Sequence, residues 1–342
     1  MRRDRAEIGD AIRRIIPVSQ SLAEAVRVTW PESGHDAPLI VEASERLTLR
    51  DWAYENRDRI LGWLRLYGAA LFRGFQMDST KLFGETVDAM MGGRISYLNR
   101  SSPRTTVDDR IYTSTDYPNH LPIFPHNEHG YSPVFPLYIF FCCFQPAETG
   151  GATPVGSTRL VGAGVPSRIR DRFREKGIMY LRNYHEGFGL PWQKAFQTTD
   201  RSQVERFCRE HGVMCEWRDG DALRTRRIGP AEITHPYTGE RIWFNHGTFY
   251  HVTTLPAAIC DELSSGFDED DLPNHTYYGD GSPIEADVLD ELRSAYLNSV
   301  RRFEWRKGDM LALDNVLAVH ARDPFTGPRR VLVSMAEEIR LT

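Results

Sequence analysis

The segment Phe124-Pro-His-Asn-Glu-His129 places an imidazole and a carboxylate two positions apart, at His126 and Glu128. In an extended segment, residues i and i+2 point to the same side of the chain, so both side chains can reach one metal ion. Two ligands hold an ion weakly. A third ligand is therefore expected from a distant part of the sequence.

His320 is the best candidate for the third ligand, because it follows an apolar stretch near the other end of the chain. Two imidazoles and one carboxylate on one face of an octahedron form the facial triad of non-haem Fe(II) oxygenases, which leaves positions open for an oxidant and a co-substrate. The same ligand types also suit zinc, which would indicate a hydrolase. With eleven histidines in the chain, the trio alone does not decide between these chemistries.

The composition is that of an ordinary globular chain and excludes several classes of protein. Of 342 residues, 41% are hydrophobic and 26% are charged, with a formal net charge of −5. These values allow a sizeable core and indicate no basic face for a nucleic acid. We find no apolar run of membrane-spanning length and no secretory signal. The five cysteines form no CxxC pair, which is typical of a reducing compartment, so we expect a cytoplasmic protein.

Short apolar runs predict β-strands around the candidate ligands. The run Leu137–Phe144 is unbroken and rich in aromatic residues, which is typical of a strand buried on both faces. His126 and His320 are 194 positions apart (320 minus 126), so the strands that carry them must pair non-locally. The further elements that we expect are strands at 310–313, 316–320 and 331–336 and helices at 203–211 and 284–298.

Non-local pairing of short strands favours a mainly β fold with helical insertions. The architecture that fits is a double-stranded β-helix, the jelly-roll or cupin-like barrel, whose open mouth would hold the site. We expect residues 1–342 to form a single domain. Within it, residues 1–45 would be a variable N-terminal segment, and residues 160–300 would contain helical insertions and lid loops.

Seven segments, in this order along the chain, carry a family pattern: Ala70–Phe75, Ser102–Arg104, Tyr112–Pro118, Pro125–Glu128, Gly150–Pro154, Trp243–Asn245 and Leu313–Arg330. Together they resemble the TauD/TfdA family of Fe(II)/2-oxoglutarate-dependent oxygenases, over the stretch from Gly68 to Met335. The likeness is greatest with the SyrP-like group of that family and with amino-acid hydroxylases related to clavaminate synthase.

The resemblance implies that His126, Glu128 and His320 are the catalytic iron ligands, with Fe(II), 2-oxoglutarate and O2 as cofactor and co-substrates. It also implies that Arg330 binds the distal carboxylate of 2-oxoglutarate with help from the hydroxyl of Thr153. A guanidinium suits a carboxylate because it can donate two parallel hydrogen bonds. Strand alternation would then turn Leu332 and Ser334 inward together with Arg330, and Arg329 outward.

Two departures from the family pattern narrow the activity. Sulfonate-binding members carry a further arginine four residues after the cofactor arginine, where this chain has Ser334, so a taurine-like substrate is not expected. Halogenating members replace the carboxylate ligand by a small residue, and Glu128 argues against that reaction.

The activity implied by the resemblance is hydroxylation of an unactivated C–H bond in an amino acid or amino-acid-derived metabolite, free or presented by a carrier protein, in natural product biosynthesis. The same centre could instead desaturate, epoxidise or cyclise the substrate. A zinc-dependent hydrolase and a non-catalytic metabolite-binding barrel remain as alternatives from other classes. We expect no nucleic-acid or membrane partner. The candidate substrate contacts are Asn99, Arg100, Asn245 and His246.

Overall fold

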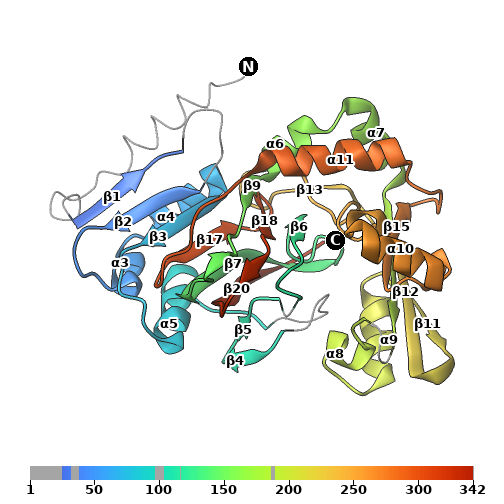
Figure 1. The fold of residues 1–342 in the computed structure, drawn as a ribbon, viewed down its shortest axis with the longest axis horizontal. Coiled ribbons are helices and arrows are strands. Elements are labelled where there is room, and N and C mark those ends of the chain that lie inside the picture. The colour runs from blue at the N-terminus through green and yellow to red at the C-terminus, as the bar shows by residue number, and fades with distance from the viewer. Residues whose placement is uncertain (1–24, 32–37, 97–103, 116, 186–188, 342) are drawn as a thin grey trace.

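The computed structural model describes residues 25–31, 38–96, 104–115, 117–185 and 189–341 (Figure 1). Within these ranges the chain is mostly β-structure with helices around it, as the sequence predicts. None of the described helices is long and apolar enough to cross a membrane.

The largest sheet has eight strands in the order β1-β2-β3-β17-β7-β20-β5-β4. All neighbours are antiparallel except β2 and β3, which run parallel. The predicted strands at 137–144, 310–313 and 331–336 form its centre, where β7 lies between β17 and β20. The strands are β1 (Val26–Thr29), β2 (Leu39–Ala43), β3 (Ala69–Arg73), β4 (Thr106–Asp108), β5 (Ile111–Thr113), β7 (Val134–Gln145), β17 (Met310–Asp314) and β20 (Arg330–Arg340).

A second sheet of four strands carries two of the candidate ligands. Its order is β16-β9-β18-β6, and His320 in β18 is the direct cross-strand partner of His126 in β6. The pairing that the sequence required between distant segments is therefore present. The strands are β6 (Ile123–His126), β9 (Val155–Ser157), β16 (Val300–Arg301) and β18 (Ala318–Arg322), with the small pair β8 (Thr149–Gly150) and β19 (Phe325–Thr326) beside them.

The two sheets face each other across an apolar layer. Val155 and Ala318 of the smaller sheet pack with side chains of β7, β17 and β20, including Phe141 and Leu313. The opposite face of the large sheet is covered by α3 (Leu49–Glu55), α4 (Arg57–Tyr67) and α5 (Thr80–Met91). Hydrogen bonds between the described strands do not join the two sheets into one closed barrel.

The region from 158 to 300 contains more β-structure than the sequence indicated. The predicted helices at 203–211 and 284–298 are present as α9 (Arg201–Glu210) and α11 (Ala286–Ser299). The region also contains an antiparallel sheet that we did not predict, in the order β11 (Met214–Arg218), β12 (Ala222–Gly229), β10 (Ile178–Tyr184) and β15 (Asn274–Tyr278). The other elements here are α6 (Thr158–Gly164), α7 (Ser167–Lys176), α8 (Trp192–Phe196), α10 (Ala257–Gly266), β13 (Glu232–Thr234), β14 (Arg241–Trp243), η1 (Asp219–Asp221), η2 (Val252–Thr254) and η3 (Glu269–Asp271).

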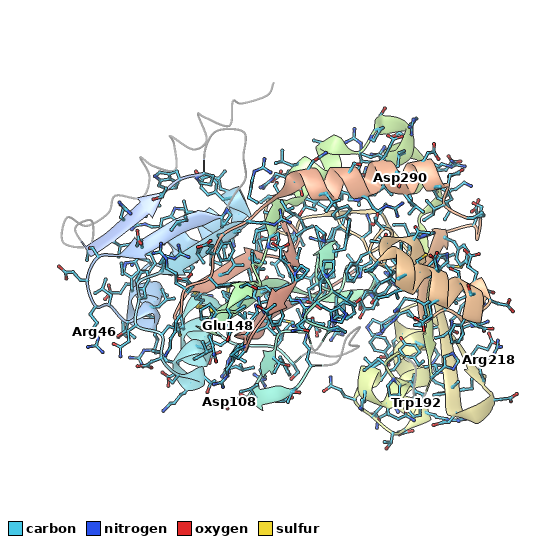
Figure 2. The ribbon with its side chains drawn as sticks, viewed as in Figure 1. Arg46, Asp108, Glu148, Trp192, Arg218 and Asp290 are labelled. Carbon is cyan, nitrogen blue, oxygen red and sulfur yellow. The ribbon has the colours of Figure 1, made fainter. Side chains whose placement is uncertain are left out.

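This third sheet was missed because three of the eight residues of β12 are arginines, a composition more typical of a polar surface segment than of a strand. Its face toward α8 and α9 nevertheless encloses a small separate core around Trp192 and Leu223. Figure 2 shows Trp192 and Arg218 in the same lobe, apart from the two facing sheets. Helices α8 and α9 and the third sheet therefore extend the molecule to one side of β6 and β18, the strands that carry the two candidate histidines (Figure 1).

We predict that Gly150→Ala destabilises the fold more than Gly212→Ala. Both glycines have a left-handed backbone, with φ of +67° and +64°, so each substitution carries a strain of roughly 1–2 kcal/mol. A Cβ at Gly150 would lie 2.2 Å from the carbonyl oxygen of Pro324, whereas a Cβ at Gly212 meets nothing within 4 Å. Overpacking adds about 1–3 kcal/mol to the cost at Gly150. Urea unfolding of the two variants measures the difference, and equal losses would contradict the close approach of β8 to β19.

Candidate metal centre

The structure brings the three predicted ligands together. His126 ends β6, Glu128 follows two positions later, and His320 lies in the neighbouring strand β18. One ligand atom from each residue lies within 4.8 Å of the other two. Glu128 and His320 are buried and His126 is half-buried, so the cluster sits inside the molecule rather than on a solvated face.

Two asparagine side chains hold the ligand segment in place. The Asn315 side-chain oxygen accepts a hydrogen bond from the Glu128 backbone N–H at 2.6 Å, and its NH2 group donates to the Glu128 carbonyl oxygen at 2.9 Å. The Asn127 NH2 group donates back to the carbonyl oxygens of Asn315 and Ala318, at 2.6 and 3.1 Å. The sequence analysis gave Asn315 no role, although it lies within the segment Leu313–Arg330 that carries the family pattern. The available signal was the position of Asn127 between the two ligands.

The histidines are in the protonation state that a metal requires. The Nδ1 of His126 lies 2.8 Å from the carbonyl oxygen of Phe124, which can only accept, so Nδ1 carries the proton and Nε2 is free to bind an ion. Burial lowers the pKa of His126, and burial together with the proximity of His126 lowers the pKa of His320 well below its usual value. Both imidazoles are therefore neutral at pH 7, as ligation demands.

Glu128 is ionised in spite of its burial. Burial alone would raise its pKa, but the guanidinium of Arg104 and the nearby imidazoles bring the pKa of Glu128 below its usual range. Arg104 Nη2 donates to Glu128 Oε2 at 2.7 Å, and each side chain is only 3% exposed. Two neutral imidazoles and one carboxylate are the donor set of an Fe(II) facial triad, so the residues present fit an iron ion.

A small cavity beside the triad holds a guanidinium that we had assigned to the other side of the strand. Arg329 lines this cavity together with Thr153 and His320. Its Nε donates to the Gly151 carbonyl oxygen at 3.0 Å, and its Nη atoms lie 3.4 Å from the hydroxyls of Ser114 and Thr153. Burial lowers the pKa of Arg329 to about 10, with a further contribution from Arg322. Among the described residues, no carboxylate pairs with this cation.

The prediction that Arg330 points inward is wrong. Arg330 is exposed, with its guanidinium carbon 5.4 Å from the centre of the Phe144 ring. The inner face of β20 carries Val331 and Val333, whereas Leu332 packs on the outer face against the helices. The β20–β7 register also shifts between residues 330 and 331. Side chains do alternate between the two faces of β20, but the odd-numbered residues face inward and not the even-numbered ones.

Thr153, which the sequence analysis paired with Arg330, lies beside Arg329 instead. Its hydroxyl accepts a hydrogen bond from the Trp305 indole N–H at 3.0 Å and lies close to Arg329. It is therefore held in position beside the guanidinium at the wall of the small cavity.

The four predicted substrate contacts are not supported as a group. Asn99 and Arg100 lie outside the described residues. The Asn245 amide donates to the Ala231 carbonyl oxygen and accepts from the Gly247 N–H, both at 2.9 Å. His246 Nε2 donates to the carbonyl oxygen of Asn127 at 2.5 Å, and burial lowers the pKa of His246 to about 3. Neither Asn245 nor His246 lines a cavity at the triad, because both side chains are used to fix backbone.

A larger cavity of about 630 Å³ opens onto His126 and Glu128. Its walls come from the segment before β6, from Phe249 and Tyr250, from α10 and from the end of α11. Phe249 stacks on the His126 ring, with 4.3 Å between ring centres and 16° between ring planes. The triad thus lies between two cavities. The small one holds the guanidinium of Arg329, which has no carboxylate partner among the described residues, and the large one has mostly apolar walls.

Two facing β-sheets around a buried His-Glu-His cluster define a metal-dependent enzyme of the mainly β class. Residues 33–336 match the family model described as taurine catabolism dioxygenase TauD, TfdA family, and the chain belongs to this family. Among curated relatives, it is 36% identical over 272 residues to the dapdiamide synthesis protein DdaC of Enterobacter agglomerans, covering 80% of this chain and 83% of that protein.

Two further comparisons agree with the family. A clavaminate synthase-like protein of Arabidopsis thaliana is 29% identical over 282 residues, covering 79% of this chain and 82% of that protein. The solved structure of PvcB from Pseudomonas aeruginosa superposes with a TM-score of 0.56 at 15% identity, over 95% of this chain and 96% of that one, and so shares the fold. The predicted TauD/TfdA membership is confirmed, and the chain is a dioxygenase whose cofactor and co-substrate are iron and 2-oxoglutarate.

We predict that Asn315→Ala weakens metal binding as well as folding. The substitution leaves the Glu128 N–H and the carbonyl oxygens of Glu128 and Pro136 without their partner, which costs about 2–4 kcal/mol of unfolding free energy. Loss of a group that orients a ligand lowers metal affinity by roughly 10–100-fold. Calorimetric titration with Co(II) and urea unfolding measure the two effects. The matched control is Asn245→Ala, which also removes buried amide bonds. An equal loss of metal affinity in the control would contradict a specific role for Asn315.

Proposed function

We propose that this dioxygenase hydroxylates an unactivated C–H bond of an amino acid or amino-acid-derived substrate, with His126, Glu128 and His320 as the iron ligands. The observation that carries the proposal is the pairing of this triad with a buried guanidinium, Arg329, in the adjoining cavity. A zinc hydrolase gives Arg329 no task, and a non-catalytic metabolite-binding barrel gives none to the three metal ligands.

In this proposal the small cavity is the end of the 2-oxoglutarate site that receives the distal carboxylate. Arg329, rather than Arg330, donates to the distal carboxylate, and the hydroxyls of Thr153 and Ser114 lie beside it as further donors. An arriving carboxylate supplies the anion that the described surroundings of Arg329 lack, in a setting where a charge-assisted pair is strong. Iron with 2-oxoglutarate and O2 supplies the oxidising power for the C–H bond when bound. The protein residues hold the ligands, orient the substrate and exclude water.

The same reading supports the exclusion of a taurine-like sulfonate. If Arg329 binds the cofactor, the position four residues later is Val333, which is buried between the sheets and is not an arginine. Ser334, the position that the sequence suggested, points away and donates to the Arg110 carbonyl oxygen at 3.0 Å. Neither residue can hold a sulfonate.

Several finer features belong to the same proposal. The name of the relative DdaC, a dapdiamide synthesis protein, supports a role in natural product biosynthesis, with a free or carrier-bound substrate. Desaturation, epoxidation and cyclisation are alternative outcomes of the same centre. We take the facing sheets as the two halves of a jelly roll in a single domain, with residues 160–300 as its insertion. The five free cysteines support a reducing, cytoplasmic location.

The test is an anaerobic titration of the metal-free protein with Fe(II) and 2-oxoglutarate, which gives a weak visible absorption band when the keto acid chelates iron. We predict that Arg329→Ala loses the band at 2-oxoglutarate concentrations that saturate the wild type, because the distal carboxylate loses its cation. Arg330→Ala is the matched control and keeps the band, because that side chain is exposed. The reverse pattern would contradict the assignment of Arg329. Absence of a band in the wild type, with tight zinc binding and ester or amide cleavage, would indicate a hydrolase.

A further inference from the structure

The large cavity at the triad has walls that favour one class of substrate. Apolar side chains reach it from four parts of the chain, among them Ile123, Phe249, Leu255, Leu263 and Leu297. The aromatic ring of Phe249 lies directly on the His126 imidazole, so the wall nearest the candidate metal is also apolar. A cavity of about 630 Å³ is the size of a small-molecule site.

Helix α10 has an apolar side that the protein covers only in part, since Ile259 and Leu263 are half-buried. None of its residues from Ala257 to Gly266 is buried, although Ile259 and Leu263 lie among them. Leu263 lines the cavity, and so does Leu297 of α11, whose side chain is 54% exposed. Exposed apolar surface on two helices that line one cavity is stabilised when an apolar group fills the space between them.

The charged groups in the described part of the lining are already used within the protein. Arg302 binds the carboxylate of Asp323 through two hydrogen bonds, of 2.7 and 3.1 Å. Arg104 binds Glu128. Arg322 donates to three backbone carbonyl oxygens of residues 117, 118 and 121 and so fixes the wall before β6. Arg104 and Arg302 thus have carboxylate partners, whereas Arg322 has none among the described residues. The rest of the described wall is mostly apolar, and this is the surface that a substrate side chain would meet.

We propose that the substrate carries an uncharged apolar group, aliphatic or aromatic, which packs between Leu263 of α10 and Leu297 of α11 and reaches the metal centre across Phe249. This inference rests on the proposed function and specifies its substrate. A substrate with a small polar side chain would leave the apolar walls exposed to water, so we expect it to bind more weakly.

The experiment uses the anaerobic complex of the full chain with Fe(II) and 2-oxoglutarate. The probes are L-leucine and L-phenylalanine, each as the free acid and as the carboxamide, against L-asparagine and L-aspartate in the same two forms. Asparagine is nearly the same shape as leucine, so it tests polarity alone. We expect the apolar probes to shift the visible band and to stimulate succinate release when O2 is admitted, and the polar probes to do neither.

Substitutions of Leu297 and Ile228 test where the apolar probes bind. Leu297→Asp weakens binding of the apolar probes at least about tenfold, because a charge replaces buried apolar area, and Leu297→Met retains binding. Ile228→Asp is the matched control, since Ile228 is also 54% exposed but does not line the cavity. We expect it to bind the probes as the wild type does.

The outcomes separate the two proposals. If the complex forms no band before any probe is added, the proposed function fails. If the band forms but the apolar probes leave it unchanged, or the polar probes act equally, the inference about the substrate is overturned and the proposed function stands. The inference about the substrate is also overturned if Ile228→Asp weakens binding of the apolar probes as much as Leu297→Asp does. The effect would then not arise in the cavity.

Discussion

The side-chain amide of Asn315 is the contact on which the site depends. It bonds both the N–H and the carbonyl oxygen of Glu128, 187 positions away in the sequence, as a neighbouring strand would. The side-chain NH2 group of Asn127 in turn donates a hydrogen bond to the backbone carbonyl oxygen of Asn315. The turn after β17 and the segment after β6 are thereby joined, and the strand that follows the turn carries His320. A buried backbone group without a partner costs more than its bond is worth, so this join is both stable and specific.

The arginines around the triad divide by what they bind. Arg104 has a carboxylate partner in Glu128, and the two charges offset each other in a buried setting. Arg329 has only neutral oxygen acceptors in its described surroundings, so its charge is poorly compensated and burial lowers its pKa to about 10. Buried charges are usually paired, and an unpaired one at the edge of a cavity indicates a binding site for an anion. A cavity with a buried cation thus lies on one side of the triad, and a mostly apolar cavity lies on the other.

Much of the centre could be predicted from residue types and spacing. The His-x-Glu pair and the distant histidine were recognisable because they lie within a series of segments that carry the family pattern, although the three residues alone fit several chemistries. The central strands at 137–144, 310–313 and 331–336 were recognisable because buried strands have unbroken apolar runs. The prediction that Arg330 faces inward was wrong, because the alternation of side chains separates the two faces of a strand without showing which face lies inside. Asn245 and His246 were predicted as substrate contacts because they are polar residues that follow an apolar run. The same pattern is found for residues whose side chains form hydrogen bonds with buried backbone groups, as these two do.

The sequence by itself determined the donor set, the family and the strands that carry the ligands, because these depend on local residue identity and period. Tertiary structure decided that Arg329 rather than Arg330 faces the triad, since packing of Val331 and Val333 against the second sheet selects the inner face of β20. It also decided that Leu263 of α10 and Leu297 of α11 line the same cavity as the segment before β6. Such choices depend on contacts between segments far apart in the chain, and no local pattern records which distant surface a side chain will meet.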